Sequence, residues 1–120
     1  MLDAFRARNG LAPLVSHPLC EAAARAHAAD LARRAVLSHG SGPGNMDTVA
    51  QRIAAQGYAW SFAAENVAFG QRDAAEVMAA WEGSPGHHAN MASPLAVHFG
   101  FGGASNHIGP YWVLVLAAPL

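Results

Sequence analysis

Histidine is unusually frequent in this chain. Seven histidines occur among 120 residues, nearly as many as the eight acidic residues. Imidazole titrates near neutral pH and binds metal ions, so this excess directs attention to a functional site. His39 directly follows a long predicted helix, Glu65 stands alone in an apolar stretch, and His87 lies in the first turn of a short predicted helix. Because an unpaired buried carboxylate costs several kcal/mol, we predict that Glu65 has a polar partner.

Each of these residues also has an ordinary structural explanation: a loop histidine, a satisfied core acid and a histidine at a helix start. The sequence evidence for other kinds of functional site is weaker. The glycine-rich segment 40–44 follows no strand and precedes no Gly-Lys-Ser/Thr, so a phosphate loop is disfavoured. The sequence has neither the Gly-x-Ser-x-Gly nor the His-Glu-x-x-His motif. Cys20 lies in an alanine-rich helix, and we expect it to be a small buried apolar residue.

Helical patterns fill most of the first 90 residues. The long central one runs from Pro18 to Val36 and is rich in alanine, which favours helix and close packing. One face of this helix carries a stripe of residues at helical spacing: Leu19, Ala23, Ala26 with His27, and Leu31. Four shorter helices are also predicted. The first runs from Leu2 to a stop at Asn9–Gly10, and the second from Asp47 or Thr48 to Gly57. The third opens with the Asp73–Glu76 capping pattern, and the fourth begins at Ser84–Pro85.

The last quarter of the chain has strand patterns. Residues 97–102 alternate bulky side chains with His98, Gly100 and Gly102, which predicts one bulky face and one bare face. A turn at 105–109 and a buried strand at 111–116 follow, while 58–69 is predicted as irregular chain feeding a strand. Helices before a terminal hairpin predict an α+β class, with helices packed on a small antiparallel sheet in one domain, residues 1–120.

Composition excludes several classes of function. Hydrophobic residues make up 52% of the chain and charged residues 12%, which excludes a disordered chain. The formal charge is −1 without a basic stripe, so we expect neither nucleic acid nor anionic lipid surfaces as partners. No apolar run approaches the length that spans a bilayer, so we expect a protein that does not cross the membrane. The single cysteine excludes an intrachain disulfide.

At these residues the chain resembles a known family, the CAP superfamily or SCP domain of cysteine-rich secretory, antigen 5 and pathogenesis-related proteins, in its bacterial branch. The resemblance extends over nearly the whole chain. Its motifs, in order, are Phe5-Arg6-x-x-Asn9-Gly10-Leu11-x-Pro13-Leu14, Ala22-Ala23-x-x-x-His27-Ala28, Ser38-His39, Ala64-Glu65-Asn66, Trp81-x-x-Ser84-Pro85-Gly86-His87-x-x-Asn90, Gly100-x-Gly102 and Tyr111-Trp112-Val113.

The resemblance implies an α-β-α sandwich and a cleft where two histidines and acidic residues converge, which in several members holds a divalent metal such as zinc. Carried over by motif, the histidines are His39 and His87 and the acid is Glu65, with Asn66 and Ser84 beside them. Ser84 stands where animal and plant members have a second acid. Glu82 lies two residues earlier, roughly 200° round the helix.

Three further histidines could belong to this set or lie outside it. His88 directly follows His87, and successive helical residues point about 100° apart, so we do not expect both to bind one metal. His98 could supply a third nitrogen if the bare strand face looks toward the cleft. His27, on the helix stripe, is predicted to be a packed histidine bonded to a neighbour. No metal is required, because Glu65 could instead hold a histidine in one tautomer.

Three functions remain open at this point. The favoured one is a binding domain for a lipid, cell-wall component or other small ligand, through the cleft or an apolar groove, with a weak divalent metal site. The alternative is a zinc-assisted hydrolase using the same cleft, with His39, His87 and Glu65 around a metal-bound water. The third is a purely structural role for these side chains.

The location of the protein is predicted from the resemblance, which implies an extracellular or periplasmic protein. The first residues resemble an amphipathic helix and lack the features of a signal peptide. The residues alone therefore fit either a cytosolic protein or a mature or trimmed exported form.

Overall fold

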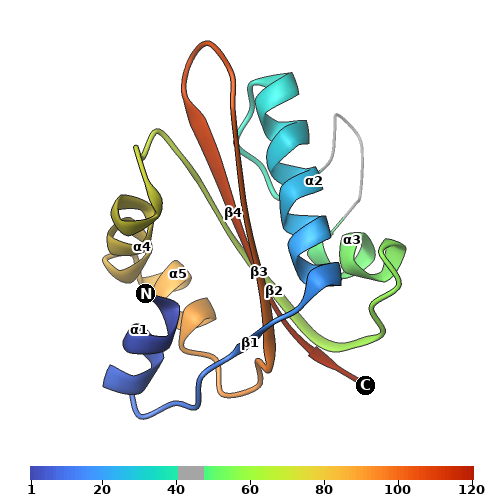
Figure 1. Cartoon of the computed structure of the whole chain (residues 1–120), viewed down its shortest axis with the longest axis vertical. Helices are drawn as coiled ribbons and strands as arrows, with labels where there is room; N and C mark the ends of the chain where they lie inside the picture. Colours follow the sequence, from blue (N-terminus) through green and yellow to red (C-terminus); the bar gives the residue numbers. More distant parts are fainter. Residues whose placement is uncertain (41–47) are drawn as a thin grey trace.

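The computed structural model describes residues 1–40 and 48–120, and its described strands form one sheet between two layers of helices (Figure 1). The strand order is β1-β3-β4-β2, with all neighbours antiparallel except the parallel pair β1–β3. The strands are β1 (Val15–Ser16), β2 (Trp60–Phe69), β3 (His98–Ser105) and β4 (Pro110–Pro119). The predicted α-β-α sandwich is confirmed, but its sheet is mixed.

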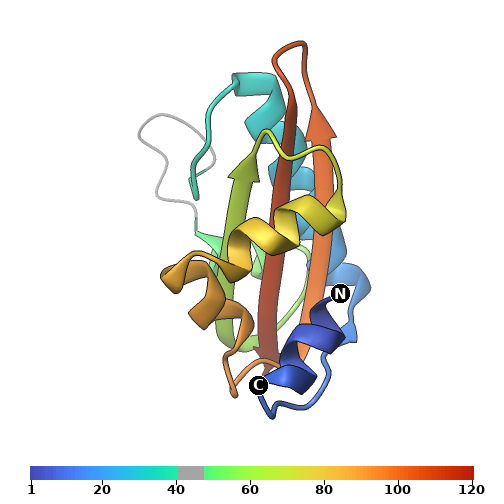
Figure 2. The same cartoon turned by 90° about the vertical axis from the view of Figure 1, so that its left-hand side faces the viewer.

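Within the described residues, five helices cover the two faces of the sheet. Helices α2 (Pro18–Arg34) and α3 (Val49–Ala55) lie on one side, and α1 (Leu2–Arg8), α4 (Ala74–Glu82) and α5 (Pro85–Met91) lie on the other (Figures 1 and 2). Each side has its own buried apolar cluster: alanines of α2 face Val113 and Val115, while Phe5, Val77 and Trp81 face Leu114 and Leu116. The sheet thus separates two cores.

The helix boundaries follow the predicted capping residues. Thr48 and Gln51 form a reciprocal capping box at the start of α3, and the Asp73 carboxylate accepts from the backbone N–H of Glu76. Ser84 occupies the N-cap position of α5, although its hydroxyl makes no capping hydrogen bond. The predicted loop residues 41–45 and Asp47 lie outside the described residues.

The bare face of β3 packs against α2. Side chains at Gly100 and Gly102 would collide with the backbone of α2, because a Cβ on Gly102 would lie 2.7 Å from the nitrogen of Arg25. Cys20 is fully buried in this contact, as predicted. The alternation of glycine with phenylalanine along β3 therefore allows a helix to approach the sheet closely on one side only.

The observed secondary structure differs from the sequence predictions in three places. Residues 60–69 are not irregular: they form the single strand β2, which pairs with β4 along its whole length despite a register shift between Trp60 and Phe62. The strand β1 was not expected, since two residues carry too little pattern to be recognised. The long helix also ends at Arg34, where Ala35 adopts a left-handed conformation with φ of 54°.

Candidate functional site

Glu65 lies at the centre of a polar cluster on the edge strand β2. Only 5% of its surface is exposed, and both carboxylate oxygens have cationic or polar partners. Its Oε1 lies 3.0 Å from Nδ1 of His39, and its Oε2 lies 2.5 Å from a guanidinium nitrogen of Arg52. The predicted partner of Glu65 is therefore present, and a second one, Arg52, joins it.

His39 is held from two sides. Arg52 of α3 donates a hydrogen bond of 2.7 Å to the His39 carbonyl, while the imidazole contacts the Glu65 carboxylate. The hydrogen bond to Glu65 raises the pKa of His39 above its ordinary value, although partial burial opposes this. The His39 side chain is 62% exposed.

His27 of α2 lies next to both Ser38 and Glu65. Its Nε2 lies 2.9 Å from the carbonyl oxygen of Ser38, to which it donates, and 3.7 Å from Oε1 of Glu65. Burial lowers the pKa of His27, so the ring is neutral at neutral pH. Its Nδ1 has no hydrogen-bond partner among residues 1–40 and 48–120. The prediction of a packed histidine bonded to a neighbour is confirmed.

His87 comes to the same edge of the sheet from the opposite helical layer. Its pKa is lowered by burial and then by the nearby charge of His39, so the two imidazoles are electrostatically coupled. Asn66 secures this position: its side-chain amide donates to the His87 carbonyl at 3.1 Å and its oxygen accepts from Asn90 at 3.0 Å. Asn90 also donates to the backbone carbonyl of Glu65 at 3.3 Å.

These hydrogen bonds give Asn66 a positioning role. The residue is fully buried, so it anchors α5 against β2 instead of facing a ligand. Ser84 is half-buried at the start of α5, and its carbonyl accepts from the backbone N–H of His88. The Glu82 carboxylate pairs with Arg8 at 2.7 Å and does not replace the missing second acid.

The other two candidate histidines lie elsewhere. The ring of His88 packs edge-on against Phe5 of α1, with centroids 4.9 Å apart, so this imidazole has a partner in α1. His98 pairs in register with Ala117, two strands away from β2, and its Nδ1 lies 2.9 Å from the hydroxyl of Tyr58. The bare strand face carries His98 toward α2, outside the cluster around Glu65.

Arg52 is the main site residue that sequence reasoning missed. Nine-tenths of its side chain is buried, although it lies in a short helix with Val49 and Ile53. An isolated glutamate in an apolar segment needs a positively charged or hydrogen-bonding partner, and this need was the sequence feature that could have pointed to an arginine. Seven arginines compete for the role, and only the packing of α3 on β2 selects one.

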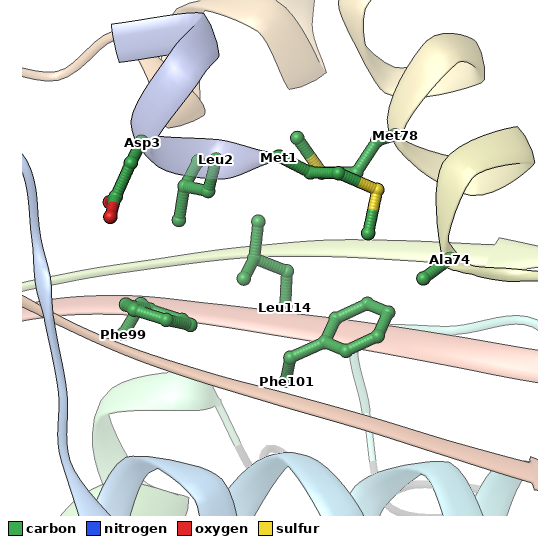
Figure 3. Close-up of a pocket in the computed structure, with 8 residues that line it drawn as sticks. All are labelled: Met1, Leu2, Asp3, Ala74, Met78, Phe99, Phe101 and Leu114. Carbon is green, nitrogen blue, oxygen red and sulfur yellow. The ribbon is translucent and has the colours of Figure 1, made fainter. Parts of the chain in front are cut away.

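A separate apolar cavity lies between α1 and α4 on the opposite face of the sheet (Figure 3). Its volume is about 210 Å³, and Asp3 is the only charged side chain among its lining residues. The cavity runs between Asp3 and Phe99 at one end and Ala74 and Phe101 at the other. The remaining lining residues are Met1, Leu2, Met78 and Leu114.

Comparison with known families agrees with this fold. The model of the cysteine-rich secretory protein family, CAP, matches residues 1–116. The chain belongs to the CAP family. A Bacillus subtilis relative, the uncharacterized protein YkwD, is 30% identical over 102 residues, which are 85% of this chain and 39% of that protein. The chain therefore spans about two-fifths of the length of this curated relative.

Solved structures of bacterial proteins share the CAP fold at low identity. An extracellular SCP-domain protein of Bacillus anthracis has a TM-score of 0.83 at 21% identity, covering 97% of this chain and 37% of that one. An outer surface protein of Borrelia burgdorferi has a TM-score of 0.89 at 19% identity, covering 99% and 87%. A cysteine-rich secretory protein of Staphylococcus aureus has a TM-score of 0.72 at 17% identity, covering 97% and 36%.

The donor set of this CAP domain suits a metal only in part. A histidine that gives its Nδ1 proton to a carboxylate keeps its Nε2 lone pair free for a metal, and His39 with Glu65 has this arrangement. His87 would be a second imidazole. Within the described ranges, no group of three or more His, Cys, Asp or Glu side chains is arranged to hold a metal ion. Glu65, already bonded to Arg52, orients His39 and is not a free ligand.

Proposed function

We propose that this CAP domain acts by binding, and that it takes the hydrocarbon chain of a lipid into the cavity between α1 and α4. The observation that carries this proposal is the composition of the cavity wall: aliphatic, aromatic and thioether side chains surround a hollow open to solvent. Transfer of apolar surface from water into such a site is favourable by about 25 cal/mol per Å².

The size of the cavity limits the ligand. Typical small-molecule sites enclose about 300–1,000 Å³, and this cavity of about 210 Å³ is smaller. It fits a segment of an alkyl chain, with the remainder of the ligand outside. Phe99 and Phe101 are half-buried and form one wall, so they would contact the chain directly.

The described locations of two structural neighbours support a ligand that lies outside the cytoplasm. The Bacillus anthracis neighbour is described as extracellular and the Borrelia burgdorferi neighbour as an outer surface protein. Across the described residues, no helix is long and apolar enough to cross a membrane. We therefore propose an exported domain that binds lipid or cell-wall amphiphiles in the extracellular space or the periplasm.

Filling the cavity should weaken ligand binding. Ala74 is the first residue of α4 and lines the cavity, so Ala74→Phe would place a phenyl ring inside it. We expect saturable binding of the fluorescent fatty acid cis-parinaric acid to the unmodified protein and at least about tenfold weaker binding to this variant, a loss of about 1.4 kcal/mol. Fluorescence titration measures both affinities.

Ala75→Phe is the matched control, because Ala75 is the next residue of the same helix and is exposed. It should bind the fatty acid as the unmodified protein does. Absence of saturable binding to the unmodified protein, or equal binding by the Ala74→Phe variant, would refute the proposed site.

A divalent metal at His39 and His87 is the second candidate function, favoured by the bond between Glu65 and the His39 ring. Zinc bound there would supply a Lewis acid, the chemistry that the hydrolase alternative requires. The chain's own contribution is orientation: Glu65 fixes the tautomer of His39, and Asn66 holds the backbone of His87. With two imidazoles as protein ligands, we expect weak binding.

Zinc titration of the untagged protein tests this candidate. Isothermal calorimetry at neutral pH should show one weak site that is lost in both the His39→Ala and His87→Ala variants. The control is His107→Ala, which removes an exposed histidine of the β3–β4 turn. A zinc affinity that survives either the His39→Ala or the His87→Ala substitution would exclude the site.

A further inference from the structure

An imidazole caps the N-terminus of α2, the helix that covers the bare face of the sheet. Nδ1 of His17 accepts the backbone N–H of Leu19 at 3.1 Å. The backbone N–H of His17 donates to the Phe99 carbonyl at 3.0 Å and so ties the same residue to β3. A ring nitrogen can accept only while it carries no proton, so the cap requires the Nδ1 lone pair.

Two other aromatic side chains contact the His17 ring. The centroid of His17 lies 4.7 Å from that of His98 and 5.1 Å from that of Tyr58, and the Tyr58 hydroxyl lies 2.9 Å from Nδ1 of His98. Burial, and secondly the proximity of His17, lowers the pKa of His98. Burial raises the pKa of Tyr58 to about 12, so its phenol is neutral and cannot neutralise a protonated neighbour.

The remaining titratable groups nearby are neutral or already paired. Burial raises the pKa of Cys20, in the first turn of α2, to about 11, so the thiol is uncharged. The Glu21 carboxylate of the same turn is paired with Arg25 at 2.6 Å. The helix N-terminus itself carries a partial positive charge, which disfavours a cation beside it.

We propose that His17, His98 and Tyr58 form an acid-labile start of α2. A proton on Nδ1 of His17 removes the acceptor of the cap and places a positive charge beside both the helix N-terminus and His98. The first turn of α2 then separates from β3 and exposes Cys20, which otherwise lies against Gly100. The device is a pH-sensitive switch in the fold, separate from the polar cluster around Glu65.

The sign of the pH dependence follows from His98. Its pKa is lower in the folded state than the usual value near 6.5, so its neutral form stabilises the fold. That contribution is complete above about pH 6.5 and is lost as the pH falls through the folded-state pKa. Loss of the neutral form of His98 therefore loosens the start of α2 in acid.

Chemical labelling of Cys20, the single cysteine, tests the proposal. The thiol reagent 4,4′-dithiodipyridine is applied to the folded protein near pH 7.5 and near pH 5, and each rate is divided by the rate for the urea-unfolded chain at the same pH. We expect the normalised rate to rise about fivefold on acidification, the factor that corresponds to loss of a typical N-cap. Far-UV circular dichroism checks that the protein stays folded.

The decisive variant is His17→Asn, because asparagine is a good N-cap and does not titrate. It should show no acid-induced rise in labelling, whereas the control His107→Asn, at an exposed site in the β3–β4 turn, should behave as the unmodified protein does. If His17→Asn does not fold, His17→Ser gives the same comparison. Equal acid responses in the cap variant and the unmodified protein would overturn the proposal.

Discussion

Replacing Gly100 by alanine should destabilise the protein by about 3 kcal/mol or more, because the new methyl group would overlap the backbone of Cys20 and Glu21. Neither neighbour can yield by rotating a side chain, since both contacts are main-chain atoms. Helix α2 would have to move away from β3 along its closest line of contact. Urea unfolding followed by circular dichroism measures the loss in free energy of unfolding.

Gly86→Ala is the matched control. Gly86 lies in α5, and no atom outside its own helix segment comes within 4 Å of an added Cβ. Alanine there should be neutral or should stabilise the helix by about 0.5–1 kcal/mol. A Gly100→Ala protein as stable as the unmodified chain would show that α2 does not rest on β3 as described.

The contrast between these glycines shows where sequence reasoning succeeds. The alternation of glycine with phenylalanine in 98–102 predicted a strand with a bare face, because the period of two is local information. What covers that face is not local. Its partner, the first half of α2, lies about 80 residues earlier in the chain, and only the assembled sheet brings the two together.

The strand β2 shows why a local pattern can mislead. Residues 60–69 contain small and aromatic residues without strict alternation, since one face meets α2 and α3 and the other meets α4 and α5. Glu65 and Asn66 look like an interruption in the sequence. In the fold they are adjacent residues that point to opposite faces, one toward His39 and the other toward His87.

The candidate site was predictable from the sequence only where a buried charged group requires a polar partner. A buried Glu65 required a partner, and the family motif supplied His39 as one. Arg52, His27 and the Asn66–Asn90 pair were not predictable as a set, because their hydrogen bonds depend on how α2, α3 and α5 meet the edge of the sheet. The metal-binding prediction stays a prediction, to be decided by the zinc titration.

The Glu65→Gln substitution is expected to cost about 3 kcal/mol of stability, because it removes the negative charge but keeps the shape of the side chain. The Arg52 guanidinium would remain buried without its counterion, and an uncompensated buried charge typically costs about 3–5 kcal/mol. The Arg52 bond to the His39 carbonyl is retained, which places the expected loss at the lower end of that range. Chemical denaturation at neutral pH measures the difference.

The same substitution should change how His39 titrates. The raised pKa of His39 means that its protonated form stabilises the fold below about pH 6.5, and that this contribution is lost as the pH rises through the folded-state pKa. The exposed ring keeps the contribution small, so NMR titration of the imidazole is the sensitive readout. In the variant the pKa of His39 should fall, because the charged acceptor of its hydrogen bond is gone.

Two comparisons separate the buried charge from a general effect of losing a carboxylate. Glu82→Gln removes the surface pair with Arg8 and should change stability by no more than about 1 kcal/mol. Adding Arg52→Met to Glu65→Gln should restore part of the lost stability, because the unpaired guanidinium is then absent. If Glu65→Gln proved as mild as Glu82→Gln, or if the double variant were less stable still, the ion pair would not be what holds His39 and α3 at the edge of β2.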